Sequence, residues 1–167
     1  MIMSDRVCLM NNSRIDQIGS PADLYFRPHS AFAADFIGES NLLAAEVAGI
    51  DGAEVTLNGA AGALLKARLD AGRSVRPGEA VKLMVRPEML RVLQDGANAD
   101  NVLDARLTDV ILVGGVTKTY ARLADGTLVA ATGLTRGPLG DIEKDAGIRL
   151  GWAKESGVVL PRERPAP

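Results

Sequence analysis

The chain has 167 residues, of which 47% are hydrophobic, enough to build one substantial core or two small ones. Its 19 basic and 21 acidic residues nearly balance, and no block of like charge occurs, which argues against a nucleic-acid footprint or a polybasic membrane patch. The longest apolar runs, such as Val110–Val113, are far shorter than the ~20 residues that span a bilayer. No signal peptide is predicted, and the single cysteine, Cys8, favours a reducing compartment.

The first 38 residues predict a β-hairpin followed by two short helices. Two strand-like stretches flank a polar turn, the second with alternating apolar and polar residues. Ser20 is a good N-cap for a helix and Pro21 fits its first turn, while Gly38 is a suitable C-cap for the second helix. The expected elements are strands at 5–10 and 14–19 and helices at 20–26 and 30–37.

Beyond Gly38 the pattern becomes a series of short strands separated by turns. The composition agrees, because 18 glycines accompany only six aromatic residues. The sole tryptophan, Trp152, is in phase with apolar neighbours and is expected in the core. A frayed tail is expected at 163–167. The predicted strands are 42–50, 54–57, 64–69, 80–85, 102–113, 116–123, 127–131, 147–152 and 158–160.

An internal repeat runs through this β region. Residues 41–47 (NLLAAEV) align with residues 101–107 (NVLDARL), and residues 81–93 resemble residues 148–160 at both ends. Two copies are too few for a solenoid, and closing short strands into barrels removes exposed sheet edges. We therefore predict a mainly β protein with two small barrels, whose halves lie at roughly 41–95 and 101–160.

Two stretches near the N-terminus carry a family resemblance. Residues 3–25 (MSDRVCLMNNSRIDQIGSPADLY) resemble the segment that follows the switch histidine in ATPases of ABC importers, and residues 32–41 (FAADFIGESN) resemble the join to their accessory domain. This branch imports polyamines, iron and sugars. The remaining β region is similar to the accessory TOBE domain, which has OB-like barrels. Its landmarks here are Val85-Arg86-Pro87-Glu88, the Val110–Tyr120 hairpin and Gly151-Trp152.

The resemblance implies a domain division and a setting. Residues 1–38 would be the end of an ATPase domain with its linker, and residues 39–162 a TOBE regulatory domain. The parent subunit would be a dimeric, cytoplasmic protein, peripheral at the inner face of the cell membrane, that binds ATP and Mg²⁺ and works with membrane permease subunits. Spermidine/putrescine-type transport is the expected process. In such families the TOBE domain contributes dimer contacts and, in some members, receives regulatory signals.

The catalytic motifs of such ATPases precede the matching segment. The phosphate loop, magnesium-binding aspartate, signature loop and switch histidine are not in this sequence, so we expect no catalytic, cofactor-binding or metal-binding residue in this chain. The segment Gly114-Gly115-Val116-Thr117-Lys118 superficially resembles a phosphate loop, but no glycine directly precedes Lys118 and a strand follows. A hairpin turn is the better interpretation.

A few other residues are candidates for a site. Arg86 and Glu88 flank Pro87 at a strand end, where they could position a partner, tie the two barrels together, or simply hold a turn through a charge pair. The only histidine, His29, and Cys8 do not suggest a zinc site or a catalytic pair. The acidic pairs Asp141 with Glu143 and Asp23 with Asp35 are expected to be solvated.

Two function classes remain, together with an expected homodimer. The first is the regulatory and dimerising portion of an importer ATPase, and the alternative is a stand-alone OB-like module that binds a small anion or metabolite at a dimer interface through Gly114, Gly115 and Lys118. A nucleic-acid-binding OB protein is disfavoured by the charge and the few aromatic residues. A homodimer, with or without exchanged N-terminal segments, would cover apolar side chains of the N-terminal segment: Val7, Leu9, Leu24, Tyr25, Phe32 and Phe36.

Overall fold

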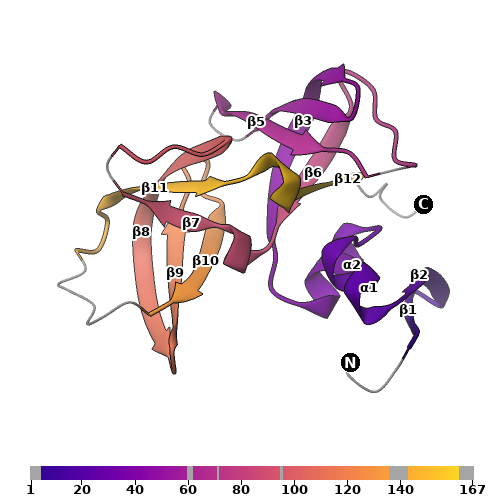
Figure 1. Cartoon of the computed structure of the whole chain (residues 1–167), viewed down its shortest axis with the longest axis horizontal. Helices are drawn as coiled ribbons and strands as arrows, with labels where there is room; N and C mark the ends of the chain where they lie inside the picture. Colours follow the sequence, from indigo (N-terminus) through magenta and orange to yellow (C-terminus); the bar gives the residue numbers. More distant parts are fainter. Residues whose placement is uncertain (1–4, 60–61, 71, 95, 136–142, 162–167) are drawn as a thin grey trace.

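The computed structural model describes residues 5–59, 62–70, 72–94, 96–135 and 143–161 (Figure 1). The protein is mainly β, as predicted, with two five-stranded sheets preceded by a hairpin and two short helices. Each predicted N-terminal element is present. The hairpin consists of β1 (Val7–Asn11) and β2 (Arg14–Gly19), and the helices are α1 (Pro21–Phe26) and α2 (Ala31–Ile37). None of the described helices is both long and apolar enough to cross a membrane.

The helix boundaries follow from their caps. The Ser20 hydroxyl accepts a hydrogen bond from the Asp23 backbone N–H, and the Asp23 carboxylate accepts one from the Ser20 backbone N–H, which completes a capping box at the start of α1. Asp23 is therefore the acidic partner of the N-cap residue Ser20. The Ser30 hydroxyl caps α2 in the same way at Ala33. Gly38 ends α2 in an extended conformation, with φ 177°, so its carbonyl is available to a partner outside the helix.

Two antiparallel sheets make up the rest of the chain. The first has the order β12-β6-β3-β4-β5 and the second β10-β9-β8-β11-β7. Within each sheet the two edge strands approach one another, so both sheets curl into barrel-like units. The strands are β3 (Asn41–Asp51), β4 (Glu54–Asn58), β5 (Leu64–Arg68), β6 (Ala80–Val85), β7 (Arg91–Leu93), β8 (Asn101–Val113), β9 (Val116–Arg122), β10 (Leu128–Leu134), β11 (Gly147–Trp152) and β12 (Gly157–Pro161).

The two halves of the β region exchange one strand each. β7 comes from the first half but pairs with β11 in the second sheet, whereas β12 comes from the second half and pairs with β6 in the first. The cause is a short 3₁₀ turn after β6 and after β11, at Pro87–Met89 and Lys154–Ser156, which redirects the chain to the other sheet. The sequence repeat is thus a structural repeat, but neither sheet is built from one half alone.

Because of this exchange, the two sheets share one main hydrophobic core instead of having one core each. A single buried cluster draws aliphatic side chains from both sheets, and Trp152 is completely buried within it, as expected. A smaller cluster joins α2 to the first sheet through Ala31 and Ala34 against Met84 and Leu160. A third cluster lies inside the N-terminal segment around Leu9 and Leu24, so these two side chains are already covered within one chain. Phe36 is 67% exposed.

Candidate functional site

The most elaborate polar contact in the described residues joins the N-terminal helices to the first sheet, and its centre is Arg86. This residue follows β6 directly and precedes the 3₁₀ turn that begins at Pro87. It is only 2% exposed. Burial lowers the pKa of its guanidinium from its ordinary value, because desolvation disfavours the charged form. A cation in this position needs compensating acceptors.

Backbone carbonyls at the ends of both helices supply those acceptors. From α1, the Tyr25 carbonyl accepts from Nη2 at 2.7 Å and from Nε at 3.2 Å. From α2 and the residues after it, Nη1 lies 2.9 Å from the Ala34 carbonyl and 3.1 Å from that of Gly38, and it also reaches the Glu39 carbonyl and the Ser40 hydroxyl. Carbonyls at helix C-terminal ends carry partial negative charge, so they suit a guanidinium. One side chain thereby fixes two helices.

Tyr25 strengthens the same contact from the other side. The Arg86 guanidinium lies over its ring, and the Tyr25 hydroxyl donates to the Glu88 carboxylate at 2.6 Å. Burial, followed by this hydrogen bond, raises the pKa of the Tyr25 phenol above 10.0. Arg86 and Glu88 therefore both bind α1, and the described residues contain no ion pair between them. Pro87 is buried and starts the 3₁₀ turn.

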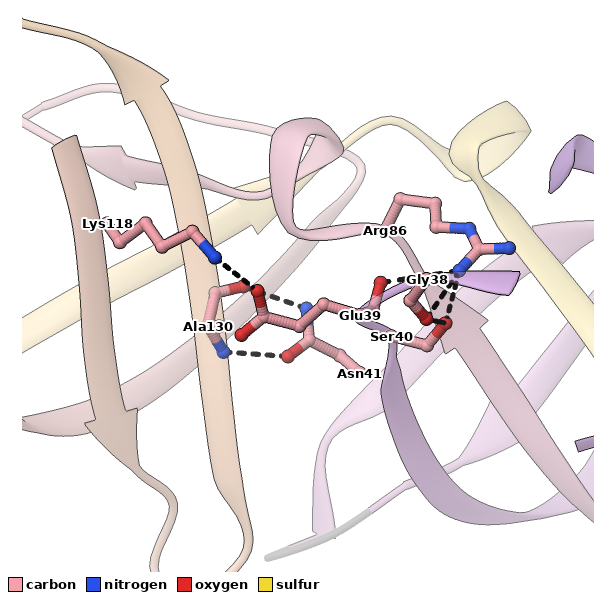
Figure 2. Close-up of polar contacts among 7 residues, drawn as sticks. All are labelled: Gly38, Glu39, Ser40, Asn41, Arg86, Lys118 and Ala130. Atoms are coloured by element: carbon pink, nitrogen blue, oxygen red, sulfur yellow. Dashed lines mark hydrogen bonds and ion pairs between the residues drawn. The ribbon is translucent and has the colours of Figure 1, made fainter. Parts of the chain in front are cut away.

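The linker between α2 and β3 lies between Arg86, at the end of β6, and Lys118, on β9 (Figure 2). Figure 2 shows Gly38 and Ser40 directed to Arg86 and the Glu39 side chain directed to Lys118 on β9. The Glu39 carboxylate is 2.7 Å from the Lys118 ammonium, and this hydrogen bond is the main cause that raises the pKa of Lys118 above 10.5. We call Arg86, Tyr25, Glu88 and the linker 38–41 the junction. It contacts α1, α2, β6 and β9 at once.

In the proposed anion-binding hairpin, the two glycines lie at the turn, whereas the Lys118 ammonium binds the linker. Gly114 and Gly115 form the exposed turn between β8 and β9, and Gly114 has φ +60°, a conformation that favours glycine. Lys118 lies further along β9, with its ammonium bound to Glu39. The two glycines and Lys118 are thus present on one hairpin, but the cation is engaged by the linker.

The remaining sequence candidates hold structural positions. The backbone N–H of His29 donates to Gln17, and His29 lines an open cavity of about 620 Å³ beside Arg27 and Arg73. Cys8 is exposed. Within the described ranges, no three His, Cys, Asp or Glu side chains lie close enough to share a metal ion. Asp141 lies outside the described residues.

Sequence reasoning missed two members of this region. The sequence groups Tyr25 with several apolar side chains, and nothing in its sequence context indicates the carbonyl and hydroxyl contacts. The sequence places Asn41 at the end of the stretch 32–41 and at the start of the repeat, but neither pattern indicates that its side-chain amide binds the backbone of Ala130 in the other sheet. The signal for Asn41 was available, because Asn101 occupies the same place in the second copy.

Comparisons with known proteins agree with the resemblance stated above. Residues 83–160 match the family model of the TOBE domain. The chain is 33% identical over 164 residues to the spermidine/putrescine import ATP-binding protein PotA of Rubrobacter xylanophilus, covering 98% of this chain and 43% of that protein. PotA 1 of Pseudomonas aeruginosa is also 33% identical, over 96% of this chain and 42% of the relative. The chain therefore spans less than half the length of these curated relatives, and it corresponds to their C-terminal regions.

Two further similarities extend this result. The sulfate/thiosulfate import ATP-binding protein CysA 2 of Chromobacterium violaceum is 38% identical over 120 residues, which is 72% of this chain and 30% of that protein. A solved structure of the cytoplasmic molybdate-binding protein ModG superposes with a TM-score of 0.64 at 18% identity, over 73% of this chain and 96% of the other. The ModG likeness confirms the OB-like, TOBE-type fold.

Proposed function

We propose that this chain is the regulatory and dimerising portion of the ATP-binding subunit of an ABC importer, in a process of the spermidine/putrescine type. The relatives that match nearly the whole chain are named spermidine/putrescine import ATP-binding proteins. The parent subunit would bind ATP and Mg²⁺ and hydrolyse ATP through motifs outside these residues. It would act as a homodimer in the cytoplasm, attached to membrane permease subunits at the inner face of the membrane.

The junction is the observation that supports a regulatory role most directly. The helices that it fixes belong to the segment resembling the end of an ATPase domain. Arg86, by contrast, directly follows β6 of the first sheet, and Lys118 and Ala130 lie in the second sheet. A movement of α1 or α2 would therefore be transmitted to β6 and β9 through short polar contacts. A buried guanidinium with several acceptors resists independent motion, because separating it leaves a desolvated charge.

The stand-alone anion-binding function has less support. ModG is named as a molybdate-binding protein, but its likeness to this chain at 18% identity concerns the fold. The cation on which that function depended, Lys118, is held by Glu39. We therefore place regulation first.

A chimeric subunit tests the proposal. The matching C-terminal region of the Rubrobacter xylanophilus relative is replaced by this chain, and ATP hydrolysis and polyamine uptake are measured in vesicles that contain its permease. We expect the chimera to support uptake, and we expect Arg86→Met to make its ATP hydrolysis resemble that of the ATPase portion alone. Arg91→Met, at an exposed arginine on β7, is the matched control. A chimera indistinguishable from the isolated ATPase portion would contradict a regulatory role.

A further inference from the structure

Asn41 makes an unusual contact across the two sheets. Its Oδ1 accepts from the Ala130 backbone N–H at 2.7 Å, and its Nδ2 donates to the Ala130 carbonyl at 2.8 Å. Asn41 is the first residue of β3 in the first sheet, whereas Ala130 lies on β10, an edge strand of the second. The side chain is buried, with 4% of the residue exposed. Figure 2 shows the amide facing the β10 backbone with both bonds formed.

Asn101 makes the same contact in the opposite direction. It starts β8 in the second sheet, and its amide accepts from the Lys66 N–H at 2.6 Å and donates to the Lys66 carbonyl at 2.9 Å. Lys66 lies on β5, an edge strand of the first sheet. Asn101 is completely buried. The two asparagines thus hold equivalent positions in the repeat, and each binds an edge strand of the other sheet.

The chemistry of the side-chain amide explains this choice of residue. An edge strand leaves alternate backbone N–H and C=O groups without a partner on its outer side, and those groups recruit further strands. A primary amide presents one carbonyl and one N–H side by side, so a single asparagine can satisfy both groups of one residue. Aspartate lacks the donor, and leucine lacks both groups.

We infer that Asn41 and Asn101 take the place of a neighbouring strand at these edges, and that Asn41 closes β10 against pairing with another chain. β10 needs such protection. The segment Thr127–Thr135 has no charged residue, and Leu128 and Leu134 are 56% and 76% exposed, which is the composition of a strand prone to pairing. Asn41 also directly follows the part of the linker that Arg86 and Lys118 hold.

The test uses the whole chain with Asn41→Leu, which keeps a similar volume and removes both hydrogen-bonding groups. Hydrogen exchange of the Ala130 amide and molar mass by light scattering are measured across a concentration series. We expect roughly tenfold faster exchange at Ala130, as for the loss of one buried hydrogen bond, and a concentration-dependent mass above that of the unchanged chain. Asn58→Leu, at an exposed asparagine on β4, is the matched control and is expected to change neither quantity.

Two more variants keep the test decisive. Adding Leu134→Lys to Asn41→Leu places a charge on the edge, so it should abolish the extra association while Ala130 exchange stays fast. If Asn41→Leu lowers the unfolding temperature so far that Trp152 fluorescence no longer indicates a folded core, Asn41→Ala is measured in its place with the same expectations. Unchanged protection of Ala130, or fast exchange with no added mass at any concentration, would overturn the inference.

Discussion

The guanidinium carbon of Arg86 lies 4.2 Å from the centre of the Tyr25 ring, so a residue at the end of β6 packs on the last turn of α1. The same guanidinium binds the Tyr25 carbonyl and the carbonyls after α2. This side chain acts together with the small apolar cluster of Ala31 and Ala34 against the first sheet, and the two contacts hold helices that are only six and seven residues long on a β domain.

Arg86→Met should destabilise the protein by about 2–4 kcal/mol, because it leaves several buried carbonyls without a donor. Chemical denaturation followed by Trp152 fluorescence and by circular dichroism measures the change. The two signals should separate in the variant, with the helical signal lost at lower denaturant than the fluorescence. Arg91→Met provides the comparison, and an equal loss in both variants would argue against the special role of Arg86.

Glu88→Gln tests the outer part of the junction. The neutral amide still accepts a hydrogen bond from Tyr25, but it removes a negative charge that opposes ionisation of the phenol. We expect the Tyr25 pKa to fall relative to the unchanged chain while burial keeps it above 10.0. Because the folded-state pKa is raised, the associated stability is fully present below pH 10.0 and is lost as the pH rises through the higher, folded-state pKa. Ultraviolet titration measures the ionisation of Tyr25, and Tyr120 is the other tyrosine of the chain. A Tyr25 midpoint that is the same in Glu88→Gln and in the unchanged chain would exclude coupling to Glu88.

Gly151→Ala should be destabilising by about 1–3 kcal/mol, since a methyl group there would overpack the strand exchange. An ideal Cβ at Gly151 would lie 2.7 Å from Leu93 Cδ1, on the exchanged strand β7, and 2.9 Å from Ala99 Cβ. Gly133→Ala is the control, because no heavy atom lies within 4 Å of its Cβ position. Thermal unfolding compares the two. Equal melting temperatures of the two variants would mean that β7 shifts to accommodate the methyl group without loss of stability.

The ion pair between Glu54 and Lys154 predicts a defined pH dependence. A hydrogen bond from Lys154 is the main cause that lowers the pKa of the Glu54 carboxyl below 4.5. Its contribution to stability is therefore complete above pH 4.5 and is lost as the pH falls through the lower, folded-state value. Carboxyl chemical shifts should show the Glu54 midpoint returning toward 4.5 in Lys154→Met. Lys66→Met, which removes a more distant ammonium at 3.9 Å, should shift it less; the reverse order would refute the assignment.

Local patterns were sufficient for much of the fold. Ser20 and Pro21 placed the start of α1, and the alternation of apolar residues placed nearly every strand, because caps and strand periodicity depend on neighbouring residues. The strand exchange was not predictable in this way. β7 and β12 pair with strands far along the chain, and nothing local distinguishes a strand that completes its own sheet from one that completes the other.

In the candidate site, too, local sequence features were predictable, whereas contacts set by the tertiary fold were not. The sequence predicts that Arg86 lies at a strand end, and it does, but the sequence does not identify the contacts of its side chain. Tyr25 and Ala34 contact it through backbone carbonyls, which every residue has and which therefore leave no trace in the sequence. The repeat of Asn41 at Asn101 was visible, yet the edge strands that these amides bind are fixed only by the tertiary fold.

Hydrogen exchange of the unchanged chain tests most directly whether the helices and the β domain act as one mechanical unit. We predict that backbone amides of α2 exchange through the same high-energy opening as those of β6, with matching dependence on denaturant, and that Arg86→Met accelerates exchange of α2 more than that of β6. Fast exchange of α2 in the unchanged chain, independent of β6 and insensitive to Arg86→Met, would contradict the coupling on which the proposed regulatory role depends.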